Sequence, residues 1–224
     1  MQNTGMSSPP HANDSTSPAS RPQRIAMPLG KVIERQEMGL RLRAERKHRG
    51  LTLRAVAERS GVSLPTLSKM ELGQVSISYD KFVAVARALG IDIAQFFGPG
   101  APDEPGAEDG QAPTFTRSAI EQAPNYRSDQ YDHHMLAVDF PQKKMIPAYS
   151  RIRARTLAEF PDYNRHPGQE FLLVLAGALR VCFENGEDVT LGATESVYFD
   201  SSVGHVYLST SDVDAQVLIV MTDA

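Results

Sequence analysis

Two side chains with ligand-binding chemistry stand four residues apart in the stretch NRHPGQEFLLVLAG, residues 164–177. His166 offers an imidazole and Glu170 a carboxylate, at the start of an apolar, strand-like run. Their even separation places both on one face if the stretch is extended. Such a pair can hold a metal ion, bind a small molecule, or lie in a solvated turn without a ligand. Which of these three hypotheses applies depends on the structural elements that surround His166 and Glu170.

The composition of this 224-residue chain predicts two folded domains, at residues 31–97 and 114–224. Residues 1–30 hold five Ser and five Pro with few large apolar groups, which favours a disordered tail. Residues 98–113 hold four Gly, four Pro and four acids, which is typical of an exposed, flexible acidic linker. Both remaining segments are long and apolar enough to form packed cores.

Charge and hydropathy narrow the class of protein. Residues 31–97 carry twelve Lys and Arg against seven Asp and Glu, whereas residues 114–224 carry nine against fifteen. A basic domain beside an acidic one favours a polyanion as partner of the first. The sequence has no apolar run of about 18 residues and no apolar centre near its start, so a membrane span and a secretory signal are not expected. We therefore predict a cytoplasmic protein.

The basic domain has the pattern of about five short helices. Thr52 and Ser63 are suited to cap the second and third helices, and Ser78 the fourth. Gly61 can end the second helix, and Pro65 stands in the first turn of the third, where no intrahelical N–H is required. The expected helices are residues 38–50, 53–60, 64–72, 79–89 and 92–97.

The second and third helices are joined by the three residues GVS, 61–63, which predicts a helix-turn-helix arrangement. Residues 39–97 resemble the XRE-type, or phage-repressor-like, helix-turn-helix transcription regulators, and nearly all of this segment carries the resemblance. In that family the second helix of the pair enters the major groove of duplex DNA. The resemblance therefore implies that the first domain binds double-stranded DNA.

Carried over position by position, the resemblance also implies which residues meet the DNA. Thr52 and Arg54 would contact backbone phosphate at the start of the second helix. Lys69 would read a base, because its ammonium can donate to guanine. Leu53 departs from the family, which often has glutamine there. The remaining groove-facing residues implied by the resemblance are Ser63, Leu64, Pro65 and Thr66.

After residue 130 the pattern changes to short β-branched and aromatic runs broken by Gly, Pro, Asn and Asp, which predicts an all-β sandwich or barrel. HPGQEFLLVLAG and LGATESVYFDSSVGHVYLS resemble the two sequence motifs of the cupins, a jelly-roll class, over residues 130–222. A helix-turn-helix domain followed by a cupin is a known arrangement among regulators, so each resemblance strengthens the other.

The cupin resemblance implies a ligand set for the residues in the opening stretch. In metal-binding cupins the first motif supplies two His and a Glu, and the second supplies a third His. Asn164 stands at the first of these positions, while His166, Glu170 and His205 match the other three. Two His and one carboxylate suffice for iron(II) or a similar divalent ion. Alternatively, these residues, with Tyr207 on the face of His205, bind an organic effector without a metal.

Two functions remain compatible with this pattern. The first is a transcription regulator, not an enzyme, whose cupin domain senses a small molecule. It needs no cofactor, although a divalent ion can occupy the three-residue set, and we expect a homodimer because one recognition helix reads too few base pairs. The alternative is a cupin metalloenzyme, an iron oxygenase or an epoxidase, with a structural helical domain; hydroxypropylphosphonate epoxidases are similar in layout. The basic charge of residues 31–97 favours the regulator.

Overall fold

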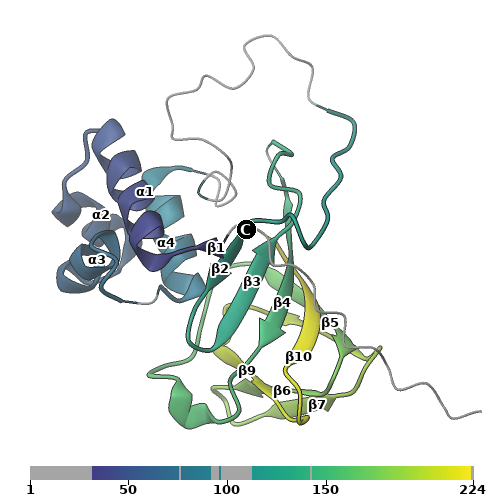
Figure 1. Cartoon of the computed structure of the whole chain (residues 1–224). Helices are drawn as coiled ribbons and strands as arrows, with labels where there is room; N and C mark the ends of the chain where they lie inside the picture. Colours follow the sequence, from purple (N-terminus) through teal and green to yellow (C-terminus); the bar gives the residue numbers. More distant parts are fainter. Residues whose placement is uncertain (1–31, 76, 92–95, 97–112, 142, 223–224) are drawn as a thin grey trace, which may run out of the picture.

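The computed structural model describes residues 32–75, 77–91, 96, 113–141 and 143–222. They form a helical domain beside a β-rich domain, as Figure 1 shows. The predicted tail at 1–30 and linker at 98–113 lie outside the described residues, apart from Pro113. The predicted fifth helix at 92–97 also lies outside them, apart from Phe96, whose ring packs edge-on against Phe82 at 4.8 Å.

Four of the five expected helices lie among the described residues. They are α1 (Arg35–His48), α2 (Leu53–Ser60), α3 (Leu64–Glu71) and α4 (Tyr79–Leu89). The predicted caps of α2 and α3 are confirmed, because the Thr52 and Ser63 side chains accept the backbone N–H groups of Ala55 and Thr66. The Ser78 side chain occupies the N-cap position of α4 without making a capping hydrogen bond.

Helices α2 and α3 form the expected helix-turn-helix pair. Gly61 ends α2 with a positive φ of 71°, a conformation that favours glycine. Val56, Leu67 and Met70 are each 1% exposed and pack the pair together. Helix α1 crosses α3 so closely at Gly39 that a Cβ atom there would lie 2.5 Å from the Met70 carbonyl oxygen.

A buried ion pair fastens α1 to the end of α3. The Arg46 guanidinium donates two hydrogen bonds to the Glu71 carboxylate, at 2.5 and 2.8 Å, and a third to the Leu51 carbonyl at 2.9 Å. The Arg46 and Glu71 side chains are 11% and 5% exposed. The hydrogen bond to Glu71 raises the pKa of Arg46. Arg46 therefore has a structural role that the charge pattern of α1 did not identify.

The β-rich domain is a two-sheet jelly roll. One sheet has the strand order β1-β2-β3-β4-β10-β5-β8 and the other β7-β6-β9. Their apolar inner faces form the core, which includes Leu172, Val174, Leu179, Val181 and Val217. The strands are β1 (Val32–Ile33), β2 (Asn125–Arg127), β3 (Tyr131–Met135), β4 (Met145–Ile152), β5 (Gln169–Ala176), β6 (Leu179–Phe183), β7 (Asp188–Leu191), β8 (Ser196–Asp200), β9 (His205–Ser209) and β10 (Ala215–Thr222).

Strands β1 and β2 were not expected from the sequence, and they join the two domains. Val32 and Ile33 precede the helices, yet they pair in parallel with Asn125 and Tyr126 of the jelly roll. The Ile77 backbone N–H donates to the Tyr126 hydroxyl at 2.7 Å, and both residues are buried. The helical domain therefore contributes a strand and a buried hydrogen bond to the β-rich domain.

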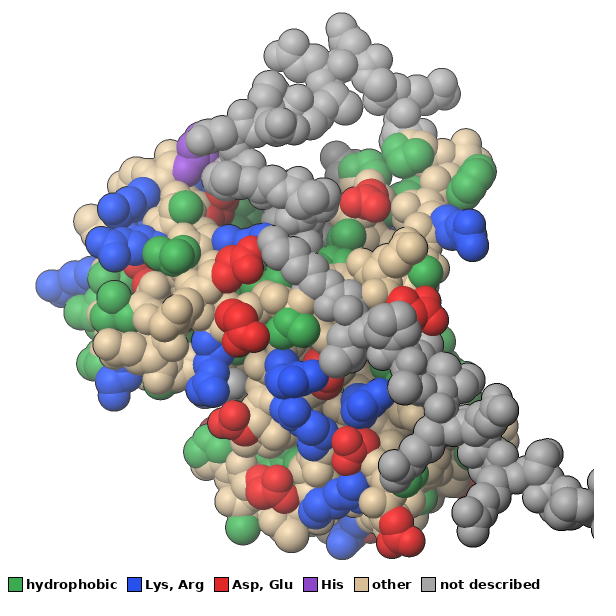
Figure 2. Space-filling model, viewed as in Figure 1, with side chains coloured by type: hydrophobic (Ala, Val, Ile, Leu, Met, Phe, Trp, Pro, Cys, Tyr) green, Lys and Arg blue, Asp and Glu red, His purple; other side chains and the backbone are tan. Residues whose placement is uncertain are grey.

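Charged side chains are distributed differently over the two domains. Figure 2 shows Lys and Arg side chains along the outer edge of the helical domain, whereas basic and acidic side chains are mixed over the β-rich domain. No helix within the described part of the chain is long and apolar enough to cross a membrane.

We expect the Glu71→Ala substitution to lower the free energy of unfolding of the helical domain by about 3 kcal/mol, because it leaves the buried Arg46 guanidinium without its carboxylate. Glu58→Ala is the matched control, since Glu58 pairs with Arg54 on the surface and should contribute less than about 1 kcal/mol. Urea denaturation followed by circular dichroism at a helical wavelength measures both. Equal losses in the two variants would contradict this role for the buried pair.

Candidate functional site

Three buried side chains of the β-rich domain converge on one point. The potential ligand atoms of His166, Glu170 and His205 all lie within 4.8 Å of one another. Glu170 Oε2 is 3.2 Å from His166 Nε2 and 3.6 Å from His205 Nε2, and the Tyr207 hydroxyl donates to Glu170 Oε1. All four residues are at most 5% exposed. The structure thus brings together the three residues that the cupin resemblance selected.

Backbone hydrogen bonds hold the two histidines beside Glu170. Asn164 and His205 form an isolated antiparallel bridge, with N–H···O distances of 3.1 and 2.9 Å, which sets the loop containing His166 against β9. The His166 N–H then donates to the Ser201 carbonyl at 3.0 Å. Gly168 turns the chain into β5 with a φ of 105°. Asn164 therefore helps to position the site through its backbone.

The hydrogen bonds of the imidazoles decide what the centre can bind. A carbonyl oxygen can only accept, so His205 Nδ1 must donate to the Val203 carbonyl, 2.9 Å away. In a neutral ring the Nε2 lone pair then faces the Glu170 carboxylate oxygen, and two acceptors repel at 3.6 Å. A cation or a proton between them removes that repulsion. The donor set, two imidazoles and one carboxylate, suits a divalent transition metal.

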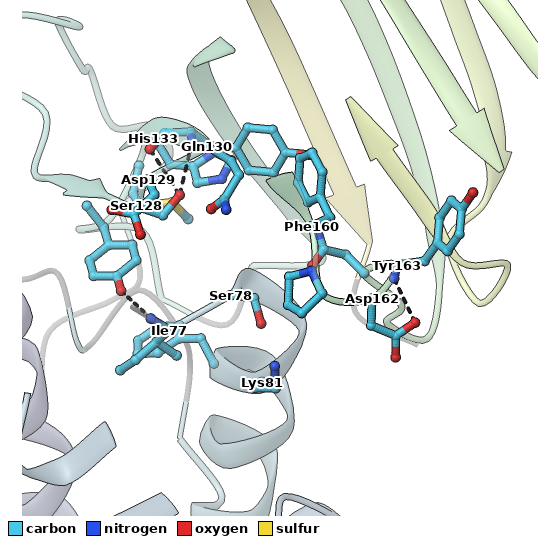
Figure 3. Close-up of a pocket in the computed structure, with 16 residues that line it drawn as sticks. Ile77, Ser78, Lys81, Ser128, Asp129, Gln130, His133, Phe160, Asp162 and Tyr163 are labelled. Carbon is cyan, nitrogen blue, oxygen red and sulfur yellow. Dashed lines mark hydrogen bonds between the residues drawn. The ribbon is translucent and has the colours of Figure 1, made fainter. Parts of the chain in front are cut away.

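Two neighbouring cavities lie at this site, and they differ greatly in size. The inner cavity, about 20 Å³, touches His166, Glu170, His205 and Tyr207 and has room for about one water-sized particle. The outer cavity, about 320 Å³, opens between the two domains and is shown in Figure 3. Both are lined by Tyr131, His133, Met135 and Asn164.

His133 and His134 are neighbours on β3, so their side chains point to opposite faces of the sheet. His133 lines both cavities and contacts the Ser150 hydroxyl at 2.7 Å. His134 points to the opposite face, where it contacts the Asn125 side chain at 3.3 Å and the Ile120 carbonyl at 3.3 Å. The two imidazoles therefore do not join one site. The role of His133 as a wall of the outer cavity was missed, because it depends on where the helical domain lies.

A second set of candidate residues lies at the start of α2 and α3. Ser63, Leu64, Pro65 and Lys69 are exposed, and Thr66 is partly exposed. The Ser63 and Thr66 hydroxyls contact one another at 2.8 Å. The side chain of Leu64 is 45% exposed. Ser63, Leu64, Pro65 and Thr66 lie at the N-terminal end of α3, and Lys69 lies in its last turn.

The start of α2 carries two further candidates. The Thr52 hydroxyl oxygen accepts the Ala55 N–H at 3.1 Å, which leaves its own proton available for a phosphate oxygen. The Arg54 side chain is 82% exposed and pairs with Glu58 across one helical turn at 3.0 Å. Leu53, which departs from the expected glutamine, packs against the apolar core. It is therefore partly buried against the core of the domain.

Two family models match the chain, one in each domain. Residues 42–96 match the model described as helix-turn-helix, HTH_3, and residues 157–221 match the model described as cupin domain, Cupin_2. These matches agree with the helical pair and the jelly roll described above. A comparison with curated proteins found no match.

Several solved structures share the two-domain layout. An HTH_3 family transcriptional regulator from Vibrio cholerae aligns with 85% of this chain and 97% of its own, at 19% identity and a TM-score of 0.55. Hydroxypropylphosphonic acid epoxidase from S. wedmorenis, in complex with fosfomycin, aligns with 85% of this chain and 99% of its own, at 19% identity and a TM-score of 0.42. At these identities the first likeness concerns the fold alone, and the second is too distant to support an argument.

Burial lowers the pKa of His133 to about 4, because removal from water disfavours the imidazolium more than Glu170 and Asp132 favour it. The pKa of His133 in the folded protein therefore lies below its pKa in the unfolded chain. The contribution of neutral His133 to the free energy of unfolding is complete above about pH 6.5 and falls as the pH drops towards 4. Between pH 6.5 and 4 we expect the free energy of unfolding to fall less in the His133→Gln variant than in the wild type. The two falls should differ by at most on the order of 3 kcal/mol. An NMR titration of His133 with a midpoint near 6.5 would contradict the assignment.

Proposed function

This chain joins a helix-turn-helix domain to a cupin domain, and we propose that it is a DNA-binding transcription regulator that responds to a small molecule at its cupin domain. One observation carries the proposal: α3 presents an exposed face, with Ser63, Leu64 and Pro65 at its N-terminal end and Lys69 in its last turn, at the place where helix-turn-helix proteins meet the major groove. The excess of basic residues in the helical domain supports it, since phosphate contacts supply much of the affinity for DNA.

The contacts with DNA divide into two kinds. Thr52 and Arg54 are proposed to bind backbone phosphate, Arg54 by exchanging its exposed contact with Glu58 for a phosphate oxygen. Lys69 is proposed to read a base by donating to guanine O6 or N7. The face around it is completed by Ser63, Leu64, Pro65 and Thr66, of which Leu64 and Pro65 offer only apolar contacts, for example to a thymine methyl group.

We further propose that the protein binds DNA as a two-fold dimer. A recognition helix of eight residues spans too few base pairs to specify one site in a genome. Two copies related by a two-fold axis read half-sites about one helical turn apart. The operator is then a pseudo-palindrome.

The cupin centre is the proposed sensing site, and a divalent metal ion is its proposed occupant. His166, Glu170 and His205 would hold the ion, which would present an electrophilic centre for an oxygen or nitrogen atom of the effector. Tyr207 would keep the Glu170 carboxylate oriented through its hydrogen bond, and Asn164 lines the same cavity. Effector binding changes DNA affinity only to the extent that it favours one arrangement of the domains, typically by about 1 to 3 kcal/mol.

An iron-dependent cupin enzyme is the second candidate function. The convergent His166, Glu170 and His205 favour it, because two histidines and one carboxylate leave coordination positions open for a substrate. The two functions differ in what they require of the helical domain. An enzyme with a structural helical domain does not need sequence-dependent binding of DNA.

We expect the protein to shift duplex fragments containing its promoter in a gel, with an affinity that falls steeply as salt rises, because bound Lys and Arg release counterions. Lys69→Ala should weaken binding by about 1 to 3 kcal/mol and relax the preference at one base pair. Arg54→Ala should weaken binding to all sequences alike and reduce the salt slope.

Arg180→Ala is the control, because Arg180 pairs with Asp188 on the surface of the cupin domain. It should leave DNA binding unchanged. If promoter fragments remain unbound at low salt, or if Arg180→Ala weakens binding as much as Lys69→Ala does, the regulator proposal fails.

We expect the protein to bind one cobalt(II) ion per chain, with visible absorption from imidazole coordination. His166→Ala and His205→Ala should each weaken binding about ten-fold or more, because each removes one of three ligands. His134→Ala is the matched control, since His134 is buried on the opposite face of β3. Stoichiometric binding that survives both ligand substitutions would rule out this metal site.

A further inference from the structure

The outer cavity between the domains is the space in which an organic ligand of this protein fits. Its volume of about 320 Å³ lies at the lower end of the range for small-molecule sites, whereas the inner cavity of about 20 Å³ holds a single ion or water. The two share four lining residues, so the outer cavity lies beside the centre formed by His166, Glu170 and His205. This inference rests on the proposed sensing function and specifies its ligand.

The helical domain supplies one wall of this cavity, through the start of α4. Ser78 and Lys81 lie on one side of it and Phe160 of the cupin domain on the other (Figure 3). Phe82 and Tyr131 also line the cavity. The Ser78 Oγ atom is buried and has no hydrogen-bond partner among the described residues. It also does not cap α4. A buried hydroxyl without a partner is costly, so a ligand that accepts its hydrogen bond is favoured.

Lys81 makes this wall suitable for an anion. It stands in the first turn of α4, where a positive charge opposes the helix dipole and does not help to stabilise the helix. The low pKa of His133 leaves that ring neutral near pH 7, so Lys81 is the one cationic side chain among the described residues that line the cavity. The dipole of the eleven-residue helix α4 also favours a negative charge at this end.

Two carboxylates, Asp129 and Asp162, lie at the rim of the cavity and limit how much negative charge it accepts. Their side chains are 71% and 70% exposed, and each has an arginine nearby, Arg35 at 4.0 Å and Arg165 at 3.5 Å. Asp162 also interacts electrostatically with Lys81. A single lysine beside two rim acids suits a monovalent anion better than a phosphate dianion.

We propose that the effector is a small carboxylate that bridges the two domains. Its carboxylate group binds Lys81 and the Ser78 hydroxyl of the helix-turn-helix domain, and its apolar or aromatic body packs against Tyr131 and Phe160. Because the ligand contacts both domains, its binding energy depends directly on how the helix-turn-helix domain lies on the cupin. That dependence supplies the coupling between effector binding and DNA binding.

Calorimetric titration of the full-length protein tests this proposal with butyrate, benzoate and phenylacetate, each against its neutral amide, and with inorganic phosphate. At least one carboxylate should bind about ten-fold tighter than its amide and tighter than phosphate. Lys81→Met should remove that preference, Ser78→Ala should reduce it several-fold, and Lys81→Arg should retain most of it. Lys144→Met, an exposed lysine away from the cavity, is the matched control.

The outcomes separate this inference from the proposed function. Equal binding of carboxylates and amides, preferential binding of phosphate, or an unchanged preference in Lys81→Met would overturn the carboxylate site. Gel shifts with the same protein samples report the DNA-binding function independently. Lys81→Met should still bind promoter DNA, because Lys81 lines the domain junction; failure of the wild type to bind DNA is a failure of the proposed function instead.

Discussion

The Glu170 carboxylate is the group around which the cupin site is organised. It is 2% exposed, and its two oxygens face His166, His205 and Tyr207. A carboxylate in so dry a place requires a proton, a cation or strong hydrogen-bond donors. His205 Nδ1 donates its hydrogen to the Val203 carbonyl oxygen, so Nε2 of the neutral ring carries a free electron pair. The geometry is therefore that of a centre that favours a positive charge.

The second constraint is the attachment of the helical domain to the edge of the jelly roll. Two backbone features achieve it, the parallel pairing of β1 with β2 and the hydrogen bond from Ile77 to the Tyr126 hydroxyl. Ile77 directly precedes the start of α4, where Ser78 and Lys81 line the outer cavity. The helices proposed to meet DNA and the cavity proposed to hold a ligand thus belong to one connected structure.

Local signals in the sequence predicted most of the elements correctly. The caps at Thr52 and Ser63, the glycine at residue 61 and the alternating strands all act within a few residues, so their physics can be read from the chain directly. The three residues at the candidate metal centre were found because two motifs could be matched to a family pattern. Their mutual distances could not be predicted, since they depend on the bridge between Asn164 and His205.

What the sequence did not predict arises from contacts across long separations. Strand β1 has two residues and no alternation to detect, and it exists because β2 lies beside it. Ser78 was assigned a capping role from its position, yet its hydroxyl faces the domain junction and caps nothing. Lys81 and His133 line the outer cavity because of the way the two domains meet. The residues next to them in the sequence do not indicate this position.

The proposed recognition of specific DNA by a two-fold assembly can be tested by selecting bound duplexes from a random library with the full-length protein at moderate salt. We expect the enrichment of one inverted repeat, with half-sites centred about one helical turn apart, and no such enrichment in a parallel selection with Lys69→Ala and Arg54→Ala combined. Binding of all sequences with equal affinity, or enrichment of the same repeat by the double variant, would contradict it.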